Sequence, residues 1–312
     1  MSIYSAVEAC GVEKSYRNII ALKDFTIRWE KGILGLIGPN GAGKSTFIKI
    51  LCTLLRPDSG YIRIFGEDTV KNSFEVRKRI GVLFENPVFH PNLEIFSSLC
   101  WIGELRGLSS QIAKRQVHEL LEYFEIKKAL KYKIKELSAG MRQKYGLILA
   151  TLGTPSLIIL DEPTSNLDPD TRHLFRKYIN RLGKEHDCNF LISSHVLGEL
   201  NTLCDGFVFL FNGKVVESGT REDLKLKIST QRFSIISKHT QKLISILSSK
   251  GIEIESIEKN KLIIKVENLN KLLELDSHIK QSEFSEEFEI LQLESGVEAL
   301  YHQLSDQYKG KG

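Results

Sequence analysis

Gly38-Pro39-Asn40-Gly41-Ala42-Gly43-Lys44-Ser45-Thr46 is the stretch of sequence that decides the fold. It follows the pattern G-x-x-x-x-G-K-S, in which a glycine-rich turn wraps the backbone around the phosphates of a nucleotide. A short apolar segment, 33–37, precedes it, and apolar residues recur at helical spacing over 47–54 after it. Strand, glycine loop and helix therefore follow one another in the order that a phosphate-binding loop requires.

The chemistry of this loop favours a polyphosphate anion. Successive backbone N–H groups and the positive end of the following helix dipole are directed at one place. A glycine-rich turn that arises by chance is the alternative, and average residue usage makes it rare in a chain of this length. The flanking strand and helix make it rarer still.

Length and composition set the class of protein. The 312 residues, 42% of them hydrophobic, suffice for about two domains with ordinary cores. The N-terminus lacks the basic and apolar pattern of a signal peptide, and no apolar run approaches the roughly 20 residues that cross a membrane. We therefore expect a chain that is itself soluble and cytosolic.

Cysteine spacing and net charge exclude further classes. The five cysteines are widely separated, which argues against a metal or disulfide framework, and Cys52 in the helix after the loop is expected to be a buried small residue. A net charge of +4 is too weak to indicate nucleic acid. One basic run is interpreted as a solvated helix face, with anionic lipid headgroups as the alternative partner. It consists of Lys127, Lys128, Lys131, Lys133 and Lys135.

The pattern predicts an α/β cassette over 1–219 and a smaller α+β domain over 220–312. Within the cassette, 86–155 reads as mostly helical, whereas 157–160 and 190–192 are continuous apolar runs typical of strands covered on both faces of a parallel sheet. After the apolar run 207–211, Asn212-Gly213 predicts the tight turn of a hairpin.

The C-terminal domain is predicted to have the order βαββαβα. That order fits a split βαβ sheet of the ferredoxin-like kind. The expected strands lie near 233–236, 252–258, 262–266 and 287–292, and the expected helices near 241–250, 269–280 and 297–306.

Two acidic residues follow the apolar run 157–160. Asp161 and Glu162 would lie at the carboxyl end of a strand, where open α/β sheets bind ligands. Asp161 would hold Mg²⁺ through water, and Glu162 would polarise a water molecule in line with a γ-phosphate. Read alone, the pair is equally compatible with a plain strand-end turn.

These residues belong to a larger motif set that resembles the ABC ATPases. Asp161-Glu162-Pro163-Thr164 with Ser165-Asn166-Leu167-Asp168 resembles the Walker B motif and D-loop, and Leu137-Ser138-Ala139-Gly140-Met141 resembles the LSGGQ signature of this family. His195 after two serines resembles the switch histidine, and Tyr16 resembles the aromatic residue that stacks on adenine. The resemblance covers 1–219.

The resemblance implies a P-loop NTPase fold with a RecA-like core and a helical subdomain at 86–155. It also implies an Mg²⁺-dependent ATPase in which Lys44 reaches the β- and γ-phosphates, Ser45 binds Mg²⁺ and Thr46 contacts the α-phosphate. Glu162 and His195 would be catalytic, and Ser45, Glu85 and Asp161 would bind the metal. The implied nucleotide-binding residues are Tyr16, Gly38, Asn40, Gly41, Gly43, Lys44, Ser45, Thr46, Glu85, Ser138, Gly140, Asp161 and Asp168.

Several of these residues also have structural interpretations. Ser138 is a candidate N-cap, which is compatible with its helix N-terminus, including Gly140, facing the γ-phosphate of a second subunit. Asp168 before Pro169 is chiefly an N-cap signal, and the resemblance adds a role across the dimer. His195 and Tyr16 could instead be core residues.

The sequence departs from the family pattern at three positions. Glu85 stands where most members have Gln, and its carboxylate can still bind Mg²⁺ or water. Ala139 and Met141 replace Gly and Gln in the signature, but the Ser-x-Gly core is kept. We expect hydrolysis to survive these changes.

The resemblance implies an ATP-hydrolysing subunit of an exporter, peripheral on the cytoplasmic side of the membrane. Its partners would be a permease on a separate chain, received by the surface at 86–93, and a second copy of this chain. The alternative interpretation of 86–93 is a solvent-exposed loop without a partner. The competing hypothesis is a soluble ABC switch that acts on a macromolecule. Under either hypothesis, residues 220–312 would serve in dimer contact or structural bracing, or would bind a small molecule.

Overall fold

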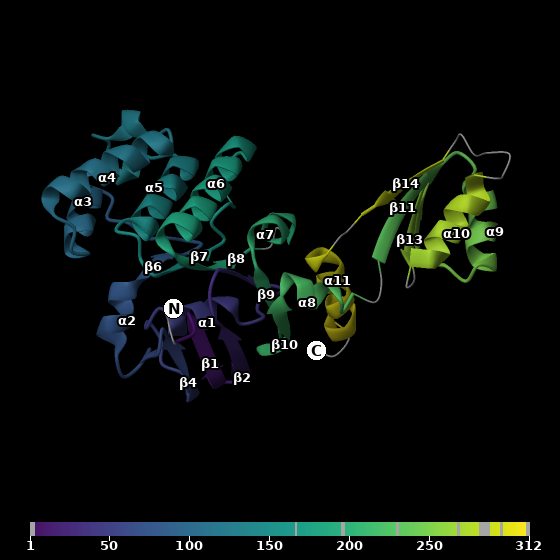
Figure 1. The fold of residues 1–312 in the computed structure, drawn as a ribbon, viewed down its shortest axis with the longest axis horizontal. Coiled ribbons are helices and arrows are strands. Elements are labelled where there is room, and N and C mark those ends of the chain that lie inside the picture. Colours follow the sequence, from purple (N-terminus) through teal and green to yellow (C-terminus); the bar gives the residue numbers. More distant parts are fainter. Residues whose placement is uncertain are drawn as a thin grey trace. The chain divides into compact units, whose positions relative to one another are not determined.

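A six-stranded sheet is the centre of the first of the two units into which the chain divides, Met1–Ser218 and Gly219–Gly312 (Figure 1). The computed structural model describes residues 4–165, 167–194, 197–228, 231–266, 269–280, 288–293 and 296–309. The sheet order is β10-β9-β3-β8-β7-β6. Its strands are β3 (Ile33–Ile37), β6 (Ile80–Leu83), β7 (Leu157–Asp161), β8 (Asn189–Ser193), β9 (Gly206–Phe211) and β10 (Lys214–Thr220).

The central strands pair in parallel and are buried throughout. β3 lies between β8 and β9, and β7 lies between β6 and β8, all in parallel register. Every residue of β3, β7, β8 and β9 is buried, as the continuous apolar runs predicted. Asn212 and Gly213 have positive φ angles of 48° and 77°, which confirms the predicted tight turn between β9 and β10.

An antiparallel sheet forms a second layer of this unit. Its order is β2-β1-β4-β5, from β1 (Val7–Tyr16), β2 (Ile19–Trp29), β4 (Ser59–Ile64) and β5 (Glu67–Asp68). Helix α1 (Lys44–Leu51) shares one hydrophobic core with both sheets through Phe47, Ile48 and Ile50. The helices α2 (Ser73–Arg79), α6 (Pro169–His186) and α7 (Leu197–Leu203) complete the α/β part.

A helical region is inserted between β6 and β7, as predicted, and its helices gather at one end of the unit (Figure 1). It consists of α3 (Ile95–Leu105), α4 (Ser110–Tyr123), η1 (Lys127–Ala129), η2 (Ile134–Glu136) and α5 (Ala139–Thr151). The five lysines of the basic run are exposed, but the prediction of a helix face was wrong. They lie on and between two short 3₁₀ turns, whose buried residues are Ala129 and Ile134.

The second unit contains the predicted βαββαβα order. Its elements are β11 (Gln231–Ser237), α9 (Thr240–Ser249), β12 (Glu253–Glu258), β13 (Lys261–Val266), α10 (Leu269–Lys280), β14 (Phe288–Gln292) and α11 (Val297–Lys309), preceded by α8 (Arg221–Lys225). The sheet order β12-β13-β11-β14, antiparallel throughout, confirms the split βαβ topology. Phe233, Ile235 and Ile264 pack with Leu243 and Leu247 of α9 to form its core.

In the ranges that the structure describes, every helix is too short or too polar to span a bilayer.

Candidate functional site

The phosphate loop lies between β3 and α1, and its glycines are dictated by backbone geometry. Gly41 and Gly43 have φ angles of 79° and 110°, in the region that favours glycine. A Cβ at Gly38 would lie 2.3 Å from the Leu210 carbonyl oxygen, and one at Gly43 would lie 2.4 Å from that of Ala21. At Gly38 and Gly43 the loop therefore has room for backbone only. Asn40, Gly41 and Ser45 are exposed to solvent, where a ligand could reach them.

Lys44 is the cation of this loop. Its Nζ donates hydrogen bonds to the carbonyl oxygens of Gly38 at 2.6 Å and Pro39 at 3.1 Å. Burial lowers the pKa of Lys44, while the nearby charges of Glu162, Asp161 and Glu85 act to raise it. The fold thus brings three predicted acidic residues near enough for their charges to act on one lysine. Behind the loop Cys52 is buried as predicted, and burial raises its thiol pKa to about 12.

The carboxyl end of β7 presents the acidic pair in a protected setting. Asp161 and Glu162 are only 5% and 8% exposed. The Ser193 hydroxyl, at the end of the neighbouring strand β8, donates a short hydrogen bond to Oδ1 of Asp161, a partner that sequence reasoning missed. The Glu162 amide donates to the Ser193 carbonyl at 3.0 Å, and Glu162 has a φ angle of 50°. The Ser193 hydroxyl orients the Asp161 carboxylate, and the amide bond fixes the backbone of Glu162. A left-handed backbone outside glycine is typical of functional positions.

Helix α5 begins where the signature resemblance predicts. Ser138 is its N-cap, and its Oγ accepts a hydrogen bond from the Met141 amide at 3.2 Å, which confirms the capping interpretation. Ser138 remains exposed and Gly140 is half-buried, so this helix N-terminus is open to a ligand.

Gln143, on the same helix, is a residue that sequence reasoning missed. Its side chain is buried and its Nε2 donates to the carbonyl oxygens of Pro163 at 2.8 Å and Glu162 at 3.4 Å. Its helical spacing was the available signal. Gly146, Leu147 and Ala150 follow it at i+3, i+4 and i+7, which places Gln143 on the buried face of α5.

Asp168 caps α6, as predicted. Its carboxylate accepts hydrogen bonds from the Thr171 amide at 2.9 Å and the Thr171 hydroxyl at 2.7 Å, and Pro169 occupies the first turn. The Thr171 amide bond, followed by the hydroxyl bond, holds the pKa of Asp168 below its usual range.

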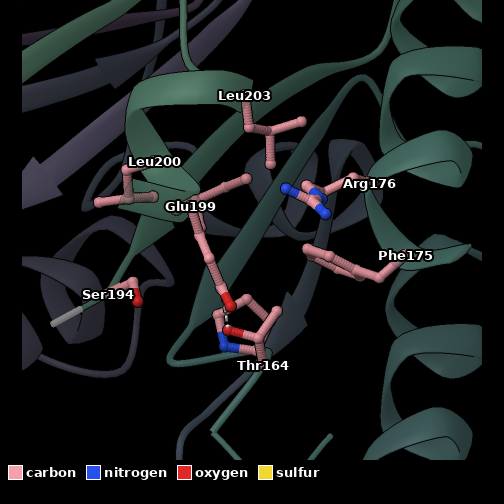
Figure 2. A pocket seen from close by; sticks show the side chains of 9 residues that line it. Thr164, Phe175, Arg176, Ser194, Glu199, Leu200 and Leu203 are labelled. Carbon is pink, nitrogen blue, oxygen red and sulfur yellow. Dashed lines mark hydrogen bonds between the residues drawn. The ribbon is translucent and has the colours of Figure 1, made fainter. Parts of the chain in front are cut away.

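A small pocket lies behind the acidic end of β7 (Figure 2). Figure 2 shows Glu199 of α7 directed at Thr164, whose hydroxyl donates to it at 2.6 Å. Arg172 of α6 donates to the other oxygen of Glu199 at 3.1 Å. Glu199 thereby joins the segment after Glu162 to two helices, a role that no local pattern indicated. Ser194 lines the pocket, and His195 lies outside the described residues.

Tyr16 and Glu85, two predicted nucleotide-binding residues, are both exposed. Tyr16 is 42% exposed at the end of β1, so the alternative that it is a core aromatic was wrong. Glu85 follows β6 and is also exposed, yet close enough for its charge to act on Lys44.

The donor set at this site suits a hard divalent cation such as Mg²⁺. Ser45 and Asp161 offer a hydroxyl and a carboxylate oxygen, and Mg²⁺ keeps waters and phosphate oxygens as its other ligands. Over the described parts of the chain, His, Cys, Asp and Glu nowhere form a group of three that could hold a metal by themselves. The chemistry thus fits a metal that enters with a nucleotide.

Comparisons with known proteins agree with this geometry. A family model described as "ABC transporter" matches residues 22–165. The chain is 35% identical to the ABC transporter ATP-binding protein NatA of Bacillus subtilis, over 65% of this chain and 83% of that protein. It is 36% identical to the bacitracin transport ATP-binding protein BcrA of Bacillus licheniformis, over 70% of this chain and 71% of that protein.

Solved structures show the same fold. A structure of an ATP-binding subunit of an ABC transporter matches with a TM-score of 0.68 and 31% identity, over 72% of this chain and 93% of that one. A dimeric bacterial ABC transporter cassette matches with a TM-score of 0.64 and 22% identity, over 69% of this chain and 98% of that one.

Proposed function

Because this chain belongs to the ATP-binding subunits of ABC transporters, we propose that it hydrolyses Mg·ATP to power export through a separate membrane permease. The observation that carries the proposal is the convergence of Lys44 with Asp161, Glu162 and Glu85 beside a loop of bare backbone. The relatives support the direction, since one is named as a Nod factor export ATP-binding protein and another for daunorubicin and doxorubicin resistance.

The phosphate loop binds the nucleotide in this proposal. The backbone amides of 38–46 bind the phosphates, Lys44 places its charge beside the β- and γ-phosphates, and the exposed Tyr16 stacks on adenine. Ser45 and Asp161 hold Mg²⁺, with Glu85 bound to it directly or through water. The metal, when present, neutralises phosphate charge.

Glu162 is the general base of the proposed reaction. It accepts a proton from the attacking water while the bond between the γ-phosphorus and the bridging oxygen breaks, which yields ADP and phosphate. Lys44 stabilises the negative charge on the transferred phosphoryl group and the leaving oxygen. By the family resemblance His195 contacts the γ-phosphate.

The proposed active unit is a homodimer of cassettes. Ser138 and Gly140 lie at an open helix N-terminus, which is suited to a γ-phosphate supplied by the facing copy. One chain carries the complete motif set, so a second copy of the same chain is sufficient.

The segment after β6 and the adjoining helix α3 are proposed to receive the permease on the cytoplasmic face of the membrane. Val88 is 97% exposed and Trp101 is 57% exposed, so this region offers apolar side chains that a permease could cover. The alternative, a soluble switch acting on a macromolecule, is not favoured by relatives named for transport, and no nucleic acid partner is expected.

Replacing the proposed base tests this function. Glu162→Gln should reduce steady-state phosphate release by about 100-fold or more, because the amide cannot accept the proton. ATP binding should persist, and size-exclusion chromatography with ATP should show a trapped dimer. Glu185→Gln, an exposed position on α6, is the matched control and should hydrolyse ATP at the native rate. Native turnover by Glu162→Gln would remove the assigned base.

A further inference from the structure

The backbone at Glu162 is held in an unusual conformation by groups from other elements. Its φ angle of 50° is rare outside glycine and persists only where surrounding contacts fix it. We propose that Gln143 of α5 is a positioning residue that fixes the backbone of Glu162 and Pro163 and ties it to the helix that begins at Ser138. This inference rests on the proposed role of Glu162 as the base.

The contacts of Gln143 are concentrated on two consecutive carbonyls. Its side chain is 4% exposed, and Nε2 donates to the Pro163 oxygen at 2.8 Å and to the Glu162 oxygen at 3.4 Å. An amide nitrogen carries two protons, so one side chain can bind both. The Glu162 amide is meanwhile bonded to the Ser193 carbonyl at 3.0 Å. The peptide groups on either side of Glu162 are therefore held from β8 and from α5.

The segment is held again just beyond Pro163. The Thr164 hydroxyl donates to Glu199 at 2.6 Å (Figure 2). Arg172 donates to the same carboxylate at 3.1 Å. This contact comes from α6 and α7, whereas Gln143 comes from the helical region. Gln143 is thus the side chain through which α5 contacts the carbonyls of the catalytic segment.

Helix α5 packs closely against β6, the strand next to β7. A Cβ at Gly81 would lie 1.8 Å from the Ala150 carbonyl oxygen, so α5 meets β6 at backbone distance. One at Gly146 would lie 2.6 Å from the Leu83 side chain. β6 in turn pairs with β7, with Gly81 opposite Ile158. Helix α5 is therefore in backbone contact with the strand that pairs with β7.

A buried amide needs partners wherever it lies, so stability alone could explain these bonds. The choice of partners indicates more, because both carbonyls belong to the strained residue and its neighbour. Ser138 and Gln143 also lie on consecutive turns of one helix. A phosphate bound at Ser138 by the facing copy would therefore act on the same rigid element that sets the backbone of Glu162.

The test compares Gln143→Met with Gln116→Met. Gln116, on α4, accepts a hydrogen bond from the Gly153 amide at 3.2 Å, so its replacement also removes a side-chain-to-backbone bond. For Gln143→Met we expect kcat to fall by about tenfold or more, with the Kd for ATP without Mg²⁺ unchanged within about twofold. For Gln116→Met we expect a lower Tm but native kcat.

A double substitution separates positioning from structural support. If Gln143 acts through the Glu162 carboxylate, Gln143→Met should cause no further loss of the residual hydrolysis of Glu162→Gln. A purely structural role predicts the same fold-loss in both backgrounds, and that result would overturn the inference.

The remaining outcomes are also decisive. Native kcat in Gln143→Met overturns the inference while leaving the proposed function intact, provided that Glu162→Gln is inactive. Native hydrolysis by Glu162→Gln instead removes the proposed base itself. If Gln143→Met does not fold, Gln143→Leu also removes the donor without introducing a charge, and is judged by the same kcat and Kd comparison.

Discussion

The sheet that carries the site and the sheet of the second unit differ in whether the carboxyl ends of neighbouring strands lie at the same edge. β3, β7 and β8 run parallel and are buried on both faces, so their carboxyl ends meet at one edge and gather Lys44, Asp161 and Ser193. In the sheet formed by β11–β14, neighbours are antiparallel and successive ends fall at opposite edges.

Burial follows the same contrast. β7 is buried at every residue, whereas β13 alternates between half-buried and buried residues. The antiparallel sheet therefore supplies a core for α9 and α10 without bringing reactive groups together. A parallel sheet concentrates chemistry at one edge, and we expect substitutions that affect hydrolysis to fall in the first unit.

The largest expected effect that sharpens this comparison comes from Lys44. Lys44→Ala should lower ATP hydrolysis by about 100-fold or more, because the charge that stabilises the transferred phosphoryl group is lost. Phosphate release measures the effect. Lys49→Ala, exposed on the same helix, and Lys265→Ala, which removes a 3.5 Å ion pair with Asp306 in the second unit, should retain native rates. An equal loss in Lys265→Ala would break the comparison.

The parts of the fold that sequence predicted are those encoded by neighbouring residues. The phosphate loop, the caps at Ser138 and Asp168 and the Asn212-Gly213 turn each depend on a few adjacent side chains. The βαββαβα order of the second unit was readable because its apolar patterns change period between strands and helices.

The parts that sequence could not supply depend on residues that meet only after folding. Gln143 bonds to a carbonyl 20 residues away, Ser193 to a carboxylate 32 residues away and Glu199 to a hydroxyl 35 residues away. Whether a side chain is exposed also depends on contacts made only after folding. The sequence around Tyr16 therefore did not decide whether this residue was buried. The lysine run was interpreted as one helix face, whereas it lies on and between two separate 3₁₀ turns.

Two glycines test the backbone packing of the two units. Gly81→Ala should destabilise the first unit by about 4 kcal/mol, because the new Cβ would lie against backbone. The distance to the Ala150 carbonyl oxygen would be 1.8 Å, which no rotamer can relieve. Gly251→Ala in the second unit meets no atom within 4 Å but has a φ angle of 61°. It should cost only roughly 1 kcal/mol.

Urea unfolding of each variant, followed by probes in each unit, measures both glycine effects. We expect Gly81→Ala to shift the transition of the first unit and Gly251→Ala that of the second. A cost for Gly81→Ala no larger than that for Gly251→Ala would show that α5 is not seated on β6 as tightly as the geometry requires.

The smallest expected effect concerns a capping aspartate in each unit. Bonds from Thr171 lower the pKa of Asp168, and bonds from Thr220 lower that of Asp223. A carboxyl whose folded pKa is depressed contributes stability above its unfolded pKa of about 3.9, and that contribution is lost as pH falls through the folded value. Asp168→Asn keeps the cap but removes this titration, so the Tm of the first unit should fall less steeply below about pH 4. Asp223→Asn should flatten only the transition of the second unit, and equal flattening of both transitions by either variant would mean that the two units unfold as one.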